Sequence, residues 1–112
     1  MILNASYFRS AGRNAIYYPE FDQRISLEPR ASNDGRALNS DGETAFNLSG
    51  NLKLNDFTVS GYYSSRWKEI PTASYNTLFN ARRETTTDRR GYLDIHYDRE
   101  MSPDLRLAAR AT

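Results

Sequence analysis

The residues from Phe46 to Leu54 alternate strictly between apolar and polar side chains, which limits the possible folds of the chain more than any other feature. One parity carries Phe46, Leu48, Gly50, Leu52 and Leu54, and the other carries Asn47, Ser49, Asn51 and Lys53. A period of two is typical of a β-strand with one apolar face. The segment has nine residues, and a tilted strand needs about 9–11 residues to cross a bilayer.

The alternation resumes after Asn55-Asp56, a pair that favours a two-residue turn. The apolar parity of this second segment carries Phe57, Val59, Gly61, Tyr63 and Trp67, and the polar parity carries Thr58, Ser60, Tyr62, Ser64 and Arg66. Pairing about a two-residue turn sets Leu54 opposite Phe57, so the apolar faces of the two segments coincide. The sequence therefore predicts a hairpin.

Three further segments repeat the design. Residues 89–98 set Gly91, Leu93, Ile95 and Tyr97 against Tyr92, Asp94, His96 and Asp98, and residues 104–112 set Leu105, Leu107, Ala109 and Ala111 against Arg106, Ala108, Arg110 and Thr112. The N-terminal segment is less regular, because Phe8 breaks its alternation, and we expect it to extend past Gly12 through Ala15 to Tyr18. We predict an all-β fold, an antiparallel up-and-down meander of about five strands at residues 2–18, 44–54, 57–67, 89–98 and 104–112.

The connections between these strands alternate in length. Residues 19–43 and 68–88 are long and polar, whereas 55–56 and 99–104 are short. Connections beyond about 12–15 residues are uncommon in compact soluble domains. Long outer loops alternating with short periplasmic turns are typical of outer-membrane barrels. We therefore expect residues 1–112 to form one incomplete segment of a transmembrane β-barrel with two long extracellular loops.

The composition suits a single sheet with one apolar and one polar face better than a domain with a conventional two-layer core. Apolar residues make up 38% of the chain, below the usual share of about 45–50%. Eight Tyr, five Phe and one Trp are nevertheless too many for a disordered chain. The N-terminus lacks the charged and apolar regions of a signal peptide, and the last strand is still running at Thr112. Both features lead us to expect a truncated chain.

Charge and cysteine content exclude other classes. The chain carries 15 basic and 14 acidic residues, interspersed, for a net charge of +1. Without a basic stripe, nucleic-acid binding has no electrostatic support. Cysteine is absent, so disulfides and thiolate metal sites are excluded.

Two stretches carry a family resemblance. Tyr-Tyr-Pro-Glu-Phe-Asp (17–22) resembles the end of an early barrel strand in TonB-dependent outer-membrane receptors. Trp-Lys-Glu-Ile-Pro-Thr-Ala-Ser-Tyr-Asn-Thr-Leu-Phe-Asn (67–80), followed by Thr-Thr-Asp (86–88), resembles an extracellular loop of the same family. The likeness covers consecutive barrel segments from about Leu3 to Thr112.

The resemblance implies a 22-stranded barrel of the bacterial outer membrane, closed by an N-terminal plug and powered by TonB. It implies that the chain is part of a transporter for an iron–siderophore, cobalamin or similar nutrient, and that it does not transport alone. The implied partners are outer-membrane lipid, the rest of the barrel and plug, TonB in the complete protein, and a small-molecule nutrient. Neither a cofactor nor an enzymatic activity is implied.

Strand parity divides the wall into two faces. We expect the apolar parity to face lipid, with Phe57, Tyr63 and Trp67 near its two ends as aromatic girdles. The residues expected to face the lumen are Asn47, Ser49, Asn51, Lys53, Thr58, Ser60, Tyr62, Ser64, Arg66, Asp94, His96 and Asp98. In the second long loop, Tyr75, Phe79, Arg82 and Arg83 are candidate ligand contacts, although the aromatic pair would equally serve to pack the loop onto the rim.

Three patterns suggest chemistry, each with a simpler interpretation. Asp94, His96 and Asp98 share one strand face, as an acid–base or metal site requires, yet lining the lumen explains them better. The stretch 32–43 resembles a calcium loop, but Ala37 occupies the first ligand position of the motif, which favours a surface loop. The basic cluster Arg82, Arg83, Arg89 and Arg90 would suit anionic groups such as lipopolysaccharide phosphates, but interleaved acids favour a solvated loop.

We predict no catalytic residue, because no phosphate-binding glycine loop, nucleophile elbow or zinc-protease helix motif is present. Two alternatives to the receptor remain. One is a soluble or surface-exposed β-meander that acts as a binding module, and the other is a segment of a different outer-membrane barrel such as a porin.

Overall fold

The computed structural model describes residues 1–112 and is all-β, with no α-helix. Its strands are β1 (Ile2–Ser10), β2 (Ala15–Tyr17), β3 (Arg36–Leu38), β4 (Glu43–Leu54), β5 (Phe57–Glu69), β6 (Thr85–Ser102) and β7 (Leu105–Ala111). Three short 3-10 turns, η1 (Pro19–Phe21), η2 (Asn33–Gly35) and η3 (Ser74–Asn76), lie in the connections. No helix has the length and hydropathy needed to cross a bilayer.

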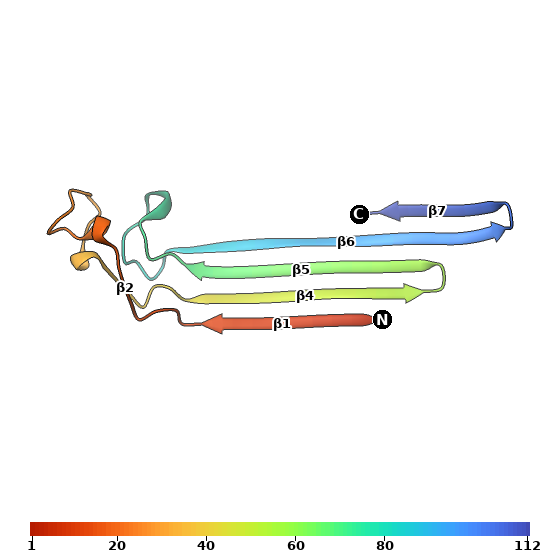
Figure 1. Ribbon diagram of the computed structural model, residues 1–112, viewed down its shortest axis with the longest axis horizontal. Coiled ribbons are helices and arrows are strands. Elements are labelled where there is room, and N and C mark those ends of the chain that lie inside the picture. Colours follow the sequence, from red (N-terminus) through yellow and green to blue (C-terminus); the bar gives the residue numbers. More distant parts are fainter. The chain divides into compact units, whose positions relative to one another are not determined.

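The strands form two sheets. The larger has five strands in the order β1-β4-β5-β6-β7, and β2 pairs with β3 in a separate sheet. The arrows of neighbouring strands point in opposite directions in Figure 1, as in an antiparallel meander. The expected all-β meander of about five strands is confirmed.

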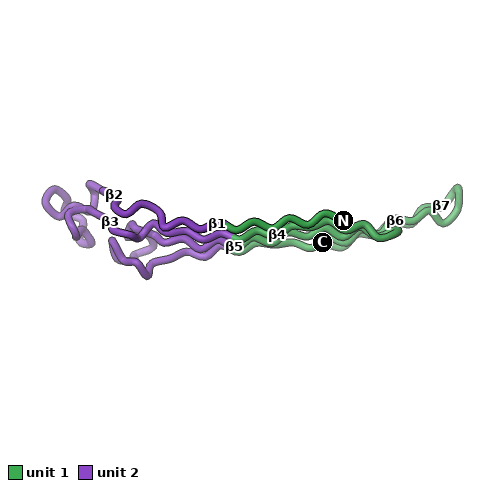
Figure 2. Tube along the Cα trace, turned by 90° about the horizontal axis from the view of Figure 1, so that it is seen from below, with its two compact units in different colours: residues 1–7, 46–65, 89–112 green, residues 8–45, 66–88 purple.

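The chain divides into two compact units, drawn in different colours in Figure 2. Unit 1 comprises residues 1–7, 46–65 and 89–112. Unit 2 comprises residues 8–45 and 66–88. The buried hydrophobic residues, which are Phe21, Ala37, Ala73 and Phe79, all belong to unit 2. Unit 1 is a single layer of sheet without a buried hydrophobic core.

Side-chain contacts fix the β4–β5 register that the alternation predicts. Asn51 Nδ2 donates to Ser60 Oγ at 2.8 Å across the hairpin, which sets each apolar residue of β4 opposite one of β5. The turn is Asn55-Asp56. Asn55 adopts φ 51°, a left-handed conformation that asparagine tolerates better than most residues.

The first strand is shorter than its alternation predicts. The prediction of one strand over 2–18 is wrong: β1 ends at Ser10, and Ala15–Tyr17 pairs with β3, with Ile16 opposite Ala37. The break lies at Gly12, where φ is +70° and an added Cβ would lie 2.1 Å from the Asp41 carbonyl oxygen. Only glycine fits this bend, so the strand ends here although Ala15 and Tyr17 keep the parity of Leu3, Ala5 and Tyr7.

The C-terminal hairpin is longer than predicted. β6 covers residues 85–102 rather than 89–98, and β7 covers 105–111 rather than 104–112, leaving Pro103-Asp104 as the turn instead of 99–104. The pairing register of β6 with β7 shifts between Glu100 and Ser102, so β6 has one more residue than β7 at this point. A β-bulge of this kind breaks the alternation locally, which is why the pattern suggests an earlier end to the strand.

Candidate functional site

One face of the unit 1 sheet carries a network of hydroxyl and amide groups. Asn47 Nδ2 donates to Ser6 Oγ at 3.1 Å, and the Tyr62 hydroxyl reaches Asn47 Oδ1 at 3.5 Å. With the Asn51–Ser60 bond, these contacts link β1, β4 and β5 side chain to side chain. The Tyr62 ring also lies 6.1 Å from the ring of Tyr92 on β6. The side-chain amides and hydroxyls named here therefore form hydrogen bonds with one another within the sheet.

The same face becomes charged on β6 and β7. Asp94, only 9% exposed, accepts hydrogen bonds from Arg110 Nε at 2.7 Å and Thr112 Oγ1 at 2.8 Å. Asp98 accepts two hydrogen bonds from the guanidinium of Arg106. Asp94 and Asp98 of β6 are thus each held by an arginine of β7. The Arg106–Asp98 pair is bidentate, a geometry that adds specificity to the contact.

This arrangement bears on the Asp94, His96 and Asp98 constellation. His96 lies opposite Arg110 in the strand register, and both flanking carboxylates are engaged by arginines. The structure brings together no group of three histidine, cysteine or acidic residues that could hold a metal ion. The geometry offers His96 no free carboxylate to orient it for acid–base work.

The polar residues predicted from parity fall into two groups. Asn47, Ser49, Asn51, Lys53, Thr58, Ser60, Tyr62, Ser64, Asp94, His96 and Asp98 belong to unit 1. Arg66 belongs to unit 2, where its guanidinium donates to Glu43 Oε1 at 2.7 Å and Oε2 at 3.2 Å. Arg66 is therefore committed to an ion pair at the edge of a loop.

Unit 2 has a small core of its own. The rings of Phe21 and Phe79 stack at 4.5 Å, and Tyr18 meets Phe79 edge-on at 6.0 Å. Hydrogen bonds between side chains and the backbone reinforce the contact, since Leu38 N donates to Asn80 Oδ1 at 2.7 Å and Arg30 Nη1 donates to the Ala73 carbonyl at 2.9 Å. The two long connections are joined into one folded body.

Phe79 is almost fully buried. It is 6% exposed and packs the two connections together, so of its two sequence interpretations the structure favours packing over an exposed ligand contact. Tyr75 is the opposite case, because it is 86% exposed and adopts φ 55° within η3. A bulky residue in the left-handed region is uncommon. Arg82 and Arg83 are exposed and form no ion pair.

A buried carboxylate organises the first long connection. Asp22 is 1% exposed. Arg24 donates to both of its oxygens at 2.8 and 2.6 Å, and the Tyr17 hydroxyl donates at 3.0 Å. These hydrogen bonds, that from Arg24 foremost, hold the pKa of the Asp22 carboxyl well below its usual range. Asp22 is the anchor of a turn that sequence patterns alone did not single out.

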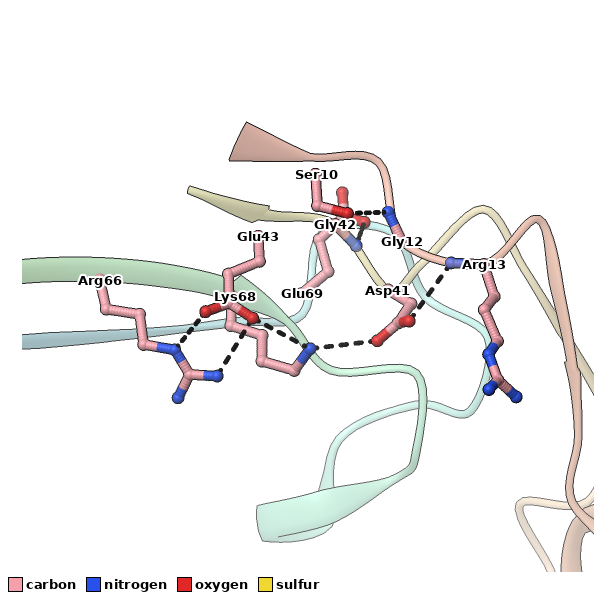
Figure 3. Close-up of polar contacts among 9 residues, drawn as sticks. All are labelled: Ser10, Gly12, Arg13, Asp41, Gly42, Glu43, Arg66, Lys68 and Glu69. Atoms are coloured by element: carbon pink, nitrogen blue, oxygen red, sulfur yellow. Dashed lines mark hydrogen bonds and ion pairs between the residues drawn. The ribbon is translucent and has the colours of Figure 1, made fainter. Parts of the chain in front are cut away.

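A second charged cluster lies at the base of the connections (Figure 3). Lys68 Nζ lies 3.1 Å from Asp41 Oδ1 and 3.6 Å from Glu43 Oε2. Glu69 accepts a hydrogen bond from Gly42 N at 2.8 Å, and Asp41 accepts one from Arg13 N at 3.3 Å. The hydrogen bond from Lys68 lowers the pKa of Asp41. These contacts hold residues 41–43, at the end of the first connection, against Lys68 and Glu69, at the start of the second.

The stretch 32–43, which suggests calcium, is used for these contacts instead. Asp34 Oδ1 accepts a hydrogen bond from Gln23 Nε2 at 2.9 Å, while Asp41 is held by Lys68. Its carboxylates point to different partners. An oxygen cage for Ca²⁺ needs six to eight converging oxygens, and the described side chains do not converge in this way.

The fold and its surfaces define a single-layer antiparallel meander with one apolar face, one polar face and a separately cored pair of long connections. Comparison with protein-family models, with characterised proteins and with solved structures found no match to this chain.

Proposed function

We propose that the chain is part of the wall of an outer-membrane β-barrel, of the TonB-dependent receptor type, and serves nutrient uptake within a larger transporter. The observation that carries the proposal is the bare apolar face of unit 1. Leu48, Leu93 and Leu107 are 38%, 59% and 52% exposed. A continuous apolar face of this kind normally lies against protein or lipid.

Aromatic pairs at both ends of that face support a lipid partner. Phe46 lies 6.5 Å from Tyr63, and Phe57 lies 4.8 Å from Tyr97, measured between ring centroids. The six residue-to-residue steps from Phe57 to Tyr63 span about 20 Å of strand. Outer-membrane barrels carry an apolar band about 25 Å tall between aromatic girdles. The spacing of the pairs agrees with such a band.

The polar face supports the same assignment. Asp94 and Asp98 are paired with arginines, and Asn51 is bonded to a hydroxyl of the neighbouring strand, so this face is polar as the inner face of a barrel is. The assignment to TonB-dependent receptors, rather than to porins, rests on the resemblance of residues 17–22 and 67–80. The transported nutrient would be an iron chelate, cobalamin or another scarce small molecule.

Refolding tests the wall. Refolded with phospholipid vesicles, the chain is expected to bind the lipid and to protect unit 1 from protease. Trp67, the sole tryptophan, reports depth: lipids brominated near the headgroup should quench its fluorescence more than lipids brominated at the chain end. A water-soluble monomer that does not bind vesicles and unfolds cooperatively would refute the proposal.

Sequencing the coding region on both sides tests the receptor type, because TonB-dependent receptors carry a plug upstream of the barrel and porins do not.

A surface-exposed binding module is the second candidate. The core of unit 2 favours it, because loops with their own packing are often functional. This candidate predicts solubility without detergent, whereas a bare apolar face predicts aggregation. Sedimentation of the refolded chain in plain buffer therefore separates the two.

A further inference from the structure

Two glycines interrupt the apolar face of unit 1 at the same level. The β4–β5 register sets Gly50 opposite Gly61. On the β1 side an added Cβ at Gly50 would lie 3.3 Å from Leu3 Cδ1, and on the β6 side one at Gly61 would lie 3.7 Å from Leu93 Cδ1. The row across four strands therefore reads Leu3, Gly50, Gly61, Leu93, with its middle two side chains missing.

The missing side chains leave a hollow. It has a volume of about 240 Å³ and is lined by Leu3, Gly50, Leu52, Val59 and Gly61, with Met1, Ile2 and Asn51 at its margin. An engineered apolar cavity of about 150 Å³ stays dry and takes up benzene. The hollow is thus large enough for several carbons of a hydrocarbon chain.

The lining of the hollow and its position between the aromatic residues indicate which chemical group would bind there. No charged side chain lines the hollow, so the complementary group is uncharged. On β5, Gly61 lies between Phe57 and Tyr63, which mark the two aromatic ends of the face. A headgroup would lie at the level of the aromatic pairs, whereas the level of Gly61 corresponds to the hydrocarbon tails.

We infer that this glycine hollow is a binding site for one acyl chain of a membrane lipid, an inference that rests on the proposed function. The hollow places Leu3, Leu52 and Val59 beside a tail, and each added contact within about 4 Å contributes dispersion energy. A bound tail is therefore held longer here than over parts of the face where side chains leave no recess.

Photo-crosslinking tests the site. The full chain is refolded in phosphatidylcholine vesicles that include a phosphatidylcholine with a diazirine midway along one acyl chain. Illumination and peptide mass spectrometry then map the adducts. We expect several-fold more adduct on Leu52 and Val59 than on Leu48, which lies on the same face of β4, two residues from Gly50 and outside the hollow.

Gly61→Leu fills the hollow and Ala5→Leu is the matched control, because Ala5 shares the apolar parity but does not line the hollow. Gly61→Leu should abolish the enrichment while leaving labelling of Leu48 unchanged, and Ala5→Leu should change neither. Gly61→Ala, whose methyl fits at ordinary contact distance, should reduce the enrichment partly if the larger variant fails to refold.

The outcomes separate this inference from the proposed function. Labelling spread evenly over the apolar face, or unaffected by Gly61→Leu, overturns the acyl-chain site and leaves the wall intact. Chemical crosslinking that joins two copies through this face, together with no lipid adduct on Leu52 or Val59, would assign the hollow to a second copy and also overturn it. Absence of labelling on every face residue, with the chain in the aqueous phase, overturns both.

Discussion

Phe21 and Phe79 stack with their ring centroids 4.5 Å apart and their planes inclined by only 10°. One residue ends η1 and the other follows η3, so a single contact joins the two long connections. Aromatic pairs of this geometry contribute about 0.5–1.5 kcal/mol beyond the area that they bury. Unit 2 thereby behaves as one body rather than as two separate loops.

Phe79→Ala tests this contact. Removal of a buried phenylalanine costs about 3–5 kcal/mol, so the free energy of unfolding of unit 2 should fall by about that amount. Leu78→Ala is the neighbouring control, because Leu78 is 66% exposed and surface changes usually stay within about 0.5 kcal/mol. Native-state hydrogen exchange of residues 18–40 measures both. Equal effects of the two variants would contradict a shared core.

Single arginine substitutions on adjacent residues test the two faces of the wall. Val59 and Thr58 point to opposite faces of β5. Val59→Arg should lower the free energy of unfolding in vesicles by about 2–4 kcal/mol, the cost of arginine at the lipid midplane. Thr58→Arg should cost less than about 1 kcal/mol, because its face is polar. Urea titration in vesicles gives both values. A penalty that is the same at both sites would argue against lipid on the apolar side.

Two glycines of neighbouring strands should respond differently to alanine. An added Cβ at Gly91 would lie 2.9 Å from the Tyr62 carbonyl oxygen, whereas one at Gly61 meets no atom closer than 3.7 Å. Gly91→Ala should therefore destabilise by about 1–3 kcal/mol, as overpacking does. Gly61→Ala should be neutral, or stabilise by about 0.4–1 kcal/mol through a less flexible unfolded chain. The same urea titration serves as the measurement, and the reverse order would show that the strand register is different.

Asp22 should make unit 2 sensitive to acid. Its pKa is lowered in the folded chain, chiefly by the hydrogen bond from Arg24. The stabilisation is therefore complete well above the unfolded value of about 3.9 and is lost as the pH falls below it, through the folded pKa. Asp22→Asn removes the charge. Hydrogen exchange should show wild-type protection exceeding that of the variant at pH 7, with the difference shrinking below about pH 4. A difference that does not depend on pH would contradict the role of the ionised carboxylate.

The strands were predictable because their signal is local. The side chains at Phe46, Leu48 and Leu52 alternate in the sequence itself, and the two-residue turn fixes their partners. The end of β1 was not predictable, because it depends on the approach of Gly12 to Asp41, nearly thirty positions away. The parity of Ala15 to Tyr18 carries no trace of that contact.

The connections were harder still, since they have no period. The sequence left Phe79 open between a ligand contact and a packing residue, because its packing partner is not near it in the sequence. Its partner Phe21 lies in the other connection. The available signal was the presence of an isolated phenylalanine in each of two polar stretches, which suggests a shared packing site. Likewise, the short Asp22–Arg24 spacing gave no hint that the carboxylate is buried.

The Asn55-Asp56 turn also has a consequence for the order of folding. It joins β4 to β5 through two residues, whereas 32 residues separate β1 from β4. Closure of the longer connection costs about 2 kcal/mol more in chain entropy. The β4–β5 and β6–β7 hairpins are thus expected to zip first, and β1 to dock last onto an edge that is already built. In pulse-labelling during refolding, the amides of β1 should gain protection latest. The pairing of β1 with β4 would then be the step that completes the five-stranded sheet.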